Sequence, residues 1–161
     1  MLFRSTWLKG LLMNGFACIE IYRRALSYLI RILRSGYTWS TSSAIMSAIA
    51  LEQLGYLIEV NENGGSRLNG RRHIKFKNAL DAILENMNVA PLESSRVDDW
   101  KESRDVYMGS KHADQIEKDH LTTLNTLREN LLVLRYWIAQ RLGVPGDVLN
   151  QNPVRNPLAR K

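Results

Sequence analysis

The segment that decides the fold runs from Arg104 to Gly143 and reads RDVYMGSKHADQIEKDHLTTLNTLRENLLVLRYWIAQRLG. Its apolar residues recur at intervals of three and four, which places one set of them on a single face of an α-helix. Gly143, with Pro145 just beyond it, predicts where this helix ends. The polar patch of Lys111, His112 and Asp114 precedes the pattern, so we expect the helix to begin there. The main face contains Leu124, Leu127, Leu131, Leu134 and Ile138, and it is widened by Leu132, Val133, Tyr136 and Trp137.

Four other segments predict helices that pack around this one. Residues 44–60 are apolar on nearly all sides, which is typical of a helix at the centre of a bundle, and residues 41–43 offer hydroxyl side chains as N-caps. Residues 74–87 predict a third helix, and residues 96–107 predict a short fourth one. Residues 16–34 predict the first helix, whose inner face is formed by Ile19, Tyr22, Leu26, Leu29, Ile30 and Leu33.

The fold class follows from these helical patterns, because no segment alternates with a period of two. We expect an all-α fold, a bundle of four to five helices that forms a single domain over residues 1–144. Residues 61–73 predict one long basic loop that is rich in Gly and Asn, with a disordered, solvated tip. Residues 145–161 have little apolar content and predict a flexible basic tail.

The composition restricts the chemistry that this chain can perform. Cys18 is the single cysteine, so an intramolecular disulfide is excluded, and the three histidines are dispersed. We therefore expect no metal site and no cofactor. The apolar run from Gly10 to Ile19 is shorter than the roughly 20 residues that a membrane span requires, and it has no signal-peptide cleavage site. We interpret it as the first turns of a core helix and expect a cytoplasmic protein without membrane contact.

The charge of the chain is positive and unevenly distributed. The net charge is +6, and the first forty residues carry six basic side chains and one acid, Glu20. Between Asp81 and His120 the acids outnumber the bases two to one. Such asymmetry predicts a basic surface that suits RNA; a solvated helix face, or a basic patch that meets an acidic patch of a second copy, is the alternative. The candidate RNA-binding residues are Arg23, Arg24, Arg67, Arg71 and Arg72.

Glu52 is unusual because it lies within the apolar segment 44–60. A carboxylate in apolar surroundings needs a partner, since its desolvation is costly. An ion pair with an arginine of another helix is the favoured interpretation, and a supporting role in catalysis is the alternative.

Three stretches of the chain, taken in order, resemble HEPN domains. IYRRALSYL at residues 21–29 is similar to the opening helix of these domains, and AIMSAIALEQLGYLI at residues 44–58 resembles their central helix. YMGSKHADQ at residues 107–115, followed by LRENLLVLRYWIAQRLGV at residues 127–144, resembles the histidine turn and the closing helix. The particular likeness is to the HEPN part of abortive-infection proteins of the ApeA type. It covers most of the chain from Ile19 to Val144.

The resemblance implies metal-independent RNA cleavage at the interface of a homodimer, in a toxin or a phage-defence system. His112 matches the family histidine, which would act as general acid or base on the ribose 2′-hydroxyl. In the family motif four to six residues separate the arginine from the histidine, and the arginine steadies the charge on the phosphate. Arg104 lies further away than that spacing, and Asp105, Val106 and Tyr107 occupy the positions where the arginine would stand. The catalytic candidates are therefore His112, Arg104 and Lys111, with Glu52, Tyr107 and Asp114 in support.

Two alternatives to a ribonuclease remain open. The first is a catalytically inactive HEPN-like bundle that binds RNA in a defence system. The second is a protein-interaction module that dimerises through the helix from Leu124 to Leu142. A sensor or antitoxin protein is a further expected partner for any of the three.

Overall fold

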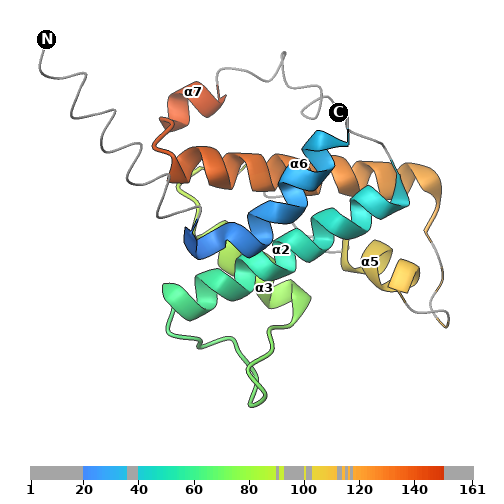
Figure 1. The fold of residues 1–161 in the computed structure, drawn as a ribbon, viewed down its shortest axis with the longest axis horizontal. Coiled ribbons are helices and arrows are strands. Elements are labelled where there is room, and N and C mark those ends of the chain that lie inside the picture. Colours follow the sequence, from blue (N-terminus) through green and yellow to red (C-terminus); the bar gives the residue numbers. More distant parts are fainter. Residues whose placement is uncertain are drawn as a thin grey trace, which may run out of the picture.

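Helix α2 (Thr41–Asn61) lies at the centre of the computed structural model, and the other long helices surround it (Figure 1). It contacts α3 (Phe76–Glu85), α5 (Ser103–Lys111) and α6 (His120–Arg141). The residues that the structure describes form helices and a single isolated bridge but no strand, which confirms the all-α prediction. These described residues are 20–35, 40–89, 91–92, 100, 103–111, 114, 116 and 118–150.

Helix α2 is central because small and apolar residues occupy most of its sides. Ser40 caps its N-terminus, and the Ser40 side chain accepts a hydrogen bond from the Ser43 amide at 3.2 Å. Gly55 lets α3 approach closely, since a Cβ at this position would lie 2.4 Å from the Ala79 carbonyl oxygen. By length and composition alone α2 could also cross a membrane, but 56% of that apolar window is buried by the rest of the protein. Its role as a core helix accounts for its apolar character.

Helix α6 has the apolar face that the sequence predicts, but it begins later. Its N-cap is Asp119, whose Oδ1 accepts a hydrogen bond from the Thr122 amide at 3.0 Å. The expected start beside the 111–114 patch was therefore wrong. The helix ends before Gly143, which adopts a φ of 79° as glycine does after many helices. The face that packs inside the bundle includes Leu127, Leu131, Leu132, Val133, Leu134 and Trp137.

The first described helix covers residues 20–34, and its buried face agrees with the prediction at Tyr22, Leu26 and Leu29 but not at Ile30 and Leu33. Ala25 and Ile32 are fully buried, whereas Ile30 is 47% and Leu33 37% exposed. The inner face therefore includes Ala25 and Ile32 in place of those two residues. The predicted Tyr22 stays inside, and its ring packs edge-on against Trp137 of α6 with centroids 4.7 Å apart. Residues 1–19, which include the predicted first turns of a core helix, lie outside the described residues.

Helix α5 extends further toward the C-terminus than the sequence predicts. The predicted short helix covers residues 96–107, whereas α5 extends from Ser103 to Lys111. Trp100 is helical and fully buried, so it forms part of the core as expected. Val97, which the pattern also places inside, lies outside the described residues.

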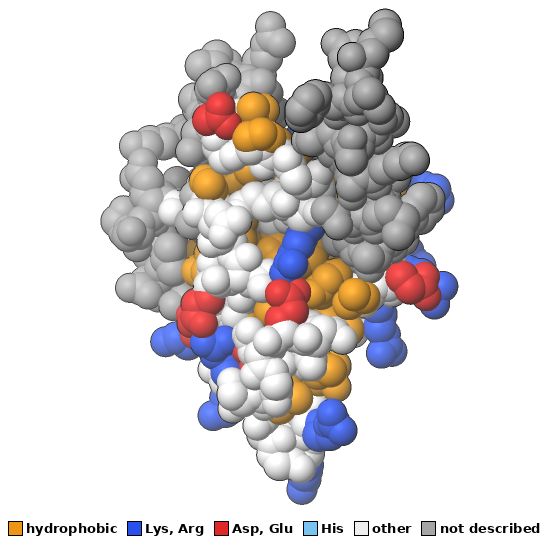
Figure 2. Space-filling model, turned by 90° about the vertical axis from the view of Figure 1, so that its left-hand side faces the viewer, with side chains coloured by type: hydrophobic (Ala, Val, Ile, Leu, Met, Phe, Trp, Pro, Cys, Tyr) orange, Lys and Arg blue, Asp and Glu red, His pale blue; other side chains and the backbone are white. Residues whose placement is uncertain are grey.

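The loop between α2 and α3 is ordered, and the expectation of a disordered tip was wrong. Leu68 and Ile74 form an antiparallel bridge, which makes a short hairpin. Asn69 closes its tip: its amide donates to the His73 carbonyl at 2.9 Å, and its side-chain oxygen accepts from the amides of Arg71 and His73 at 3.0 and 2.9 Å. In Figure 2 the molecule narrows toward its lower end, where Lys and Arg side chains gather.

The chain continues beyond α6 into a short helix, α7 (Gly146–Asn150). The Tyr136 hydroxyl on α6 donates a hydrogen bond to the Leu149 carbonyl at 2.9 Å. The first residues of the predicted tail are therefore attached to the bundle, and residues 151–161 lie outside the described part of the chain.

Candidate functional site

Two of the three predicted catalytic residues, Arg104 and Lys111, belong to α5, with Arg104 in its first turn and Lys111 at its end. Lys111 is the last residue of α5, so His112 follows this helix directly and precedes the start of α6 at His120. His112 is thus eight residues before the first residue of α6 and not in the first turn of that helix. His112 itself and the side chain of Lys111 lie outside the described residues.

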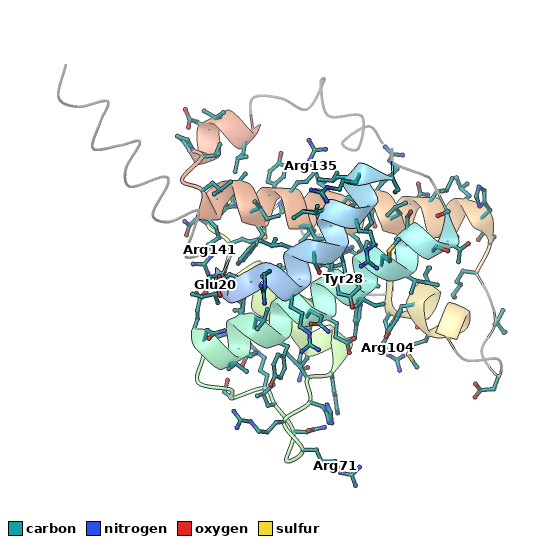
Figure 3. All side chains as sticks on the ribbon, in the orientation of Figure 1. Glu20, Tyr28, Arg71, Arg104, Arg135 and Arg141 are labelled. Carbon is teal, nitrogen blue, oxygen red and sulfur yellow. The ribbon has the colours of Figure 1, made fainter. Side chains whose placement is uncertain are left out.

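Arg104 is the described member of the catalytic candidates, and its guanidinium is accessible. Its side chain is 54% exposed, and its ion pair with Asp105 is long, at 3.8 Å. Asp105 also faces Lys118 at 3.9 Å. Exposed pairs of this kind contribute little and exchange readily with other anions. In Figure 3, Arg104 projects from α5 in the lower half of the view, and Arg71 projects from the tip of the loop below it.

The three supporting candidates occupy different environments. Tyr107 is only 9% exposed, and its ring stacks on Phe76 of α3 with centroids 5.9 Å apart. It is a packing residue of the core, so the structure does not place it at an accessible site. Glu52 is half-buried on α2, and Asp114 is exposed in the connector after α5.

The fully buried carboxylate of α2 is Glu59, which the sequence analysis did not identify. Glu59 Oε1 accepts hydrogen bonds from Asn63 Nδ2 and Arg67 Nη1, both at 2.7 Å. Its Oε2 accepts from the Arg67 amide at 3.2 Å and from the Ser66 hydroxyl at 3.4 Å. Burial alone would raise the pKa of Glu59, but the hydrogen bonds from Asn63 and Arg67 outweigh it and lower the pKa. The carboxylate therefore stays ionised and anchors the base of the loop.

This anchor changes the interpretation of Arg67, which the sequence offers as an RNA-binding residue. Its Nη2 also contacts Glu85 of α3 at 2.5 Å, and these carboxylates raise its pKa further. Arg67 is thus held by two acids and is a structural residue here. The other four candidates are exposed: Arg23 and Arg24 on helix 20–34, and Arg71 and Arg72 at the loop tip.

A second polar cluster joins four helical segments at the same C-terminal end of α2, around its C-cap residue Glu62. Arg141 Nη2 donates to both carboxylate oxygens of Glu62 at 2.5 and 2.7 Å, and to Asn86 Oδ1 at 2.5 Å. Glu62 also accepts hydrogen bonds from the Tyr22 hydroxyl and from Asn86 Nδ2. The guanidinium lies 5.1 Å from the centre of the Trp137 ring, within range of a cation–π contact. Burial would raise the pKa of Glu62, but Arg141 and the other donors lower it.

The Glu62 cluster is a structural clamp rather than a second catalytic site. Its carboxylate is engaged by several donors, and its guanidinium is held by Glu62 and Asn86. Sequence spacing does not reveal this cluster, because its members are far apart in the chain.

The core contains a third polar cluster, a chain of hydrogen bonds that links three helical segments. Trp100 Nε1 donates to Asn130 Oδ1 at 2.9 Å, Asn130 Nδ2 donates to Ser47 Oγ at 3.0 Å, and Ser47 Oγ donates to the Ala44 carbonyl at 2.7 Å. Trp100, Asn130 and Ser47 are all 0% exposed. A chain of satisfied hydrogen bonds of this kind fixes how α2 and α6 pack.

The described ranges hold no group of three or more His, Cys, Asp or Glu residues that could bind a metal ion. Comparison with models of known families, with curated proteins and with solved structures finds no match for this chain.

Proposed function

We propose that this protein is a metal-independent endoribonuclease of the HEPN-like type, which acts in the cytoplasm as part of a toxin or antiphage abortive-infection system. The active site would lie between two copies of the chain, with His112 as general acid or base. The observation that carries the proposal is the exposed, weakly paired guanidinium of Arg104 on the helix that ends directly before His112.

The reaction would be transfer of a phosphodiester to the neighbouring ribose hydroxyl. A base removes the 2′-hydroxyl proton, the 2′-oxygen attacks phosphorus, and an acid protonates the departing 5′-oxygen. The products are a 2′,3′-cyclic phosphate and a 5′-hydroxyl, and no water or metal is consumed. One imidazole cannot give and accept a proton in the same step, so His112 of one copy would act as the base, solvent would protonate the 5′-oxygen, and the second copy would supply Arg104. Arg104 and Lys111 would stabilise the charge that develops on the phosphate oxygens.

The histidines of the chain allow a controlled test of this assignment. RNA cleavage is measured in the presence of EDTA for the wild type, His112→Ala, His73→Ala and His120→Ala. His73 and His120 are both exposed, so their removal leaves the fold intact. We expect His112→Ala to lose at least 100-fold in rate, because general acid–base catalysis contributes about 10²–10⁴-fold, and the two control variants to match the wild type. Equal cleavage by all four proteins would refute the assignment.

The burial of Tyr107 supports a second candidate function. Tyr107 stands where the family arginine would stand, and its ring is packed against Phe76 in the core. A bundle in which residue 107 packs in the core suits a non-catalytic RNA-binding or dimerisation module. Such a module binds RNA in a salt-sensitive way but yields no cyclic-phosphate ends. Dimerisation through the apolar face of α6 is not supported, because Leu127, Leu131 and Leu134 are at most 2% exposed inside one copy.

A further inference from the structure

The loop between α2 and α3 combines a strong positive charge with a fixed backbone. No acid occurs between Glu62 and Asp81, whereas this stretch contains five Lys or Arg residues. One of them, Arg67, is neutralised by Glu59 and Glu85 at the base of the loop. The remaining four are exposed, namely Arg71, Arg72, Lys75 and Lys77.

The backbone that presents these cations is held in one conformation. At the base, Glu59 is fully buried and binds both the amide and the guanidinium of Arg67. At the tip, Asn69 binds the amides of Arg71 and His73 through its side chain. Among the described residues, Arg72 alone has a positive φ without being glycine, and the angle is 59°. Residues with a Cβ keep this strained conformation only where surrounding contacts hold it. The tip is therefore fixed before any ligand arrives.

The position of the loop exposes its charge to a large ligand. Residues 62–75 extend away from the bundle in Figure 1, and the narrow lower end of the molecule in Figure 2 carries Lys and Arg side chains. A polyanion can therefore approach these cations from several sides. A preformed loop also loses less conformational entropy on binding than a disordered one, which favours affinity.

We propose that residues 66–75, hereafter the basic hairpin, together with Lys77, form the docking site for the phosphodiester backbone of the RNA substrate. The inference rests on the proposed function, because it takes RNA as the ligand. It goes beyond that function by assigning binding to the basic hairpin rather than to the arginines of helix 20–34. Glu59 acts as a positioning residue, since it holds the hairpin in place and does not touch RNA.

The test compares two double variants with equal loss of charge. Binding of a fluorescent 20-nucleotide poly(U) is measured between 50 and 300 mM NaCl for the wild type, Arg71→Gln/Arg72→Gln and Arg23→Gln/Arg24→Gln. Each lost phosphate contact lowers the salt slope by about 0.7–0.9, which corresponds to roughly four- to fivefold in affinity near 0.15 M salt. We expect the hairpin variant to bind roughly 15- to 30-fold more weakly at that salt concentration, and the helix variant to bind within about twofold of the wild type.

A third variant tests whether the fixed backbone matters. Asn69→Ala removes the side chain that organises the tip but keeps every cation, and Asn69 is exposed, so the fold survives. We expect weaker poly(U) binding with an unchanged salt slope, because the number of phosphate contacts is the same and only their preorganisation is lost. Circular dichroism confirms that each variant is folded.

Every outcome decides the proposal. Equal losses in both double variants, or a larger loss in the helix variant, would overturn it while RNA cleavage by the wild type still supports the proposed function. Equal binding of poly(U) and of a poly-glutamate peptide, both lost in the hairpin variant, would indicate an acidic protein partner and would also overturn it. A wild type that neither binds nor cleaves RNA at 50 mM salt would refute the proposed function as well.

Discussion

Replacing Arg67 with alanine should lower the free energy of unfolding, because the buried carboxylate of Glu59 loses its charged partner. The change removes the hydrogen bond to Glu59 Oε1 at 2.7 Å but leaves Asn63 and the backbone amide of residue 67 as donors. Loss of one partner from a buried ion pair costs about 3–5 kcal/mol. Because Arg67 is 28% exposed and three donors remain, the third being the Ser66 hydroxyl, we expect the free energy of unfolding to fall by about 2–3 kcal/mol at pH 7.

The destabilisation caused by Arg67→Ala should become smaller as the pH falls. The folded-state pKa of Glu59 lies below the ordinary 4.5, so this group stabilises the wild type above pH 4.5 and ceases to do so as the pH falls through the lowered value. Without Arg67, burial raises the pKa of Glu59, and the group protonates at a higher pH. The difference between the two proteins should therefore shrink between pH 7 and pH 3.

Urea denaturation at pH 7 and pH 3 measures both effects, with Arg71→Ala as the control. Arg71 is exposed at the loop tip, so its removal should change the free energy of unfolding by no more than about 0.5 kcal/mol. A loss for Arg67→Ala that is equally small, or one that is the same at both pH values, would refute the reasoning.

The remaining predictions concern the core. Gly55→Ala should destabilise the protein by about 3 kcal/mol or more, because the added Cβ would lie 2.4 Å from the Ala79 carbonyl oxygen. This clash outweighs the better helix propensity of Ala, which is about 1 kcal/mol. A melting temperature at or above that of the wild type would contradict this prediction. Asn130→Leu should cost about 2–4 kcal/mol, since it leaves the Trp100 and Ser47 groups without their partner; an unchanged urea midpoint would contradict the proposed role of this chain of hydrogen bonds.

The elements that follow from local periodicity could be predicted from the sequence. The spacing of Leu127, Leu131 and Leu134 identifies the buried face of α6, and Gly143 marks its end. The start of α6 was missed because the polar residues before it resemble a first helical turn. The deciding signal was Asp119, whose side chain caps the Thr122 amide.

The buried face of helix 20–34 could be predicted only in part. Ile32 is as apolar as Ile30 and Leu33, and Ala25 is also compatible with burial, so several overlapping helical faces fit the pattern. Packing against α6 selects among them through Tyr22 and its contact with Trp137, and no local spacing in the sequence records that contact.

The polar clusters depend on pairings that spacing cannot show. Arg141 and Glu62 are 79 residues apart, and Asn130 and Ser47 are 83 apart. Glu59 and Arg67 are separated by only eight residues, but they lie in a helix and a loop, where no fixed period relates them. For the candidate site, the sequence indicates which residues carry suitable chemistry, and the structure separates accessible Arg104 from buried Tyr107.

Mixing two inactive variants tests the central proposal most directly. His112→Ala and Arg104→Ala are each assayed for RNA cleavage in EDTA, then mixed in equal amounts and allowed to exchange subunits. If each site takes its histidine from one copy and its arginine from the other, half of the dimers are mixed and each has one intact site, which restores about a quarter of the wild-type rate. A mixture as inactive as its components would contradict a shared site, and full activity of His112→Ala alone would contradict the ribonuclease proposal itself.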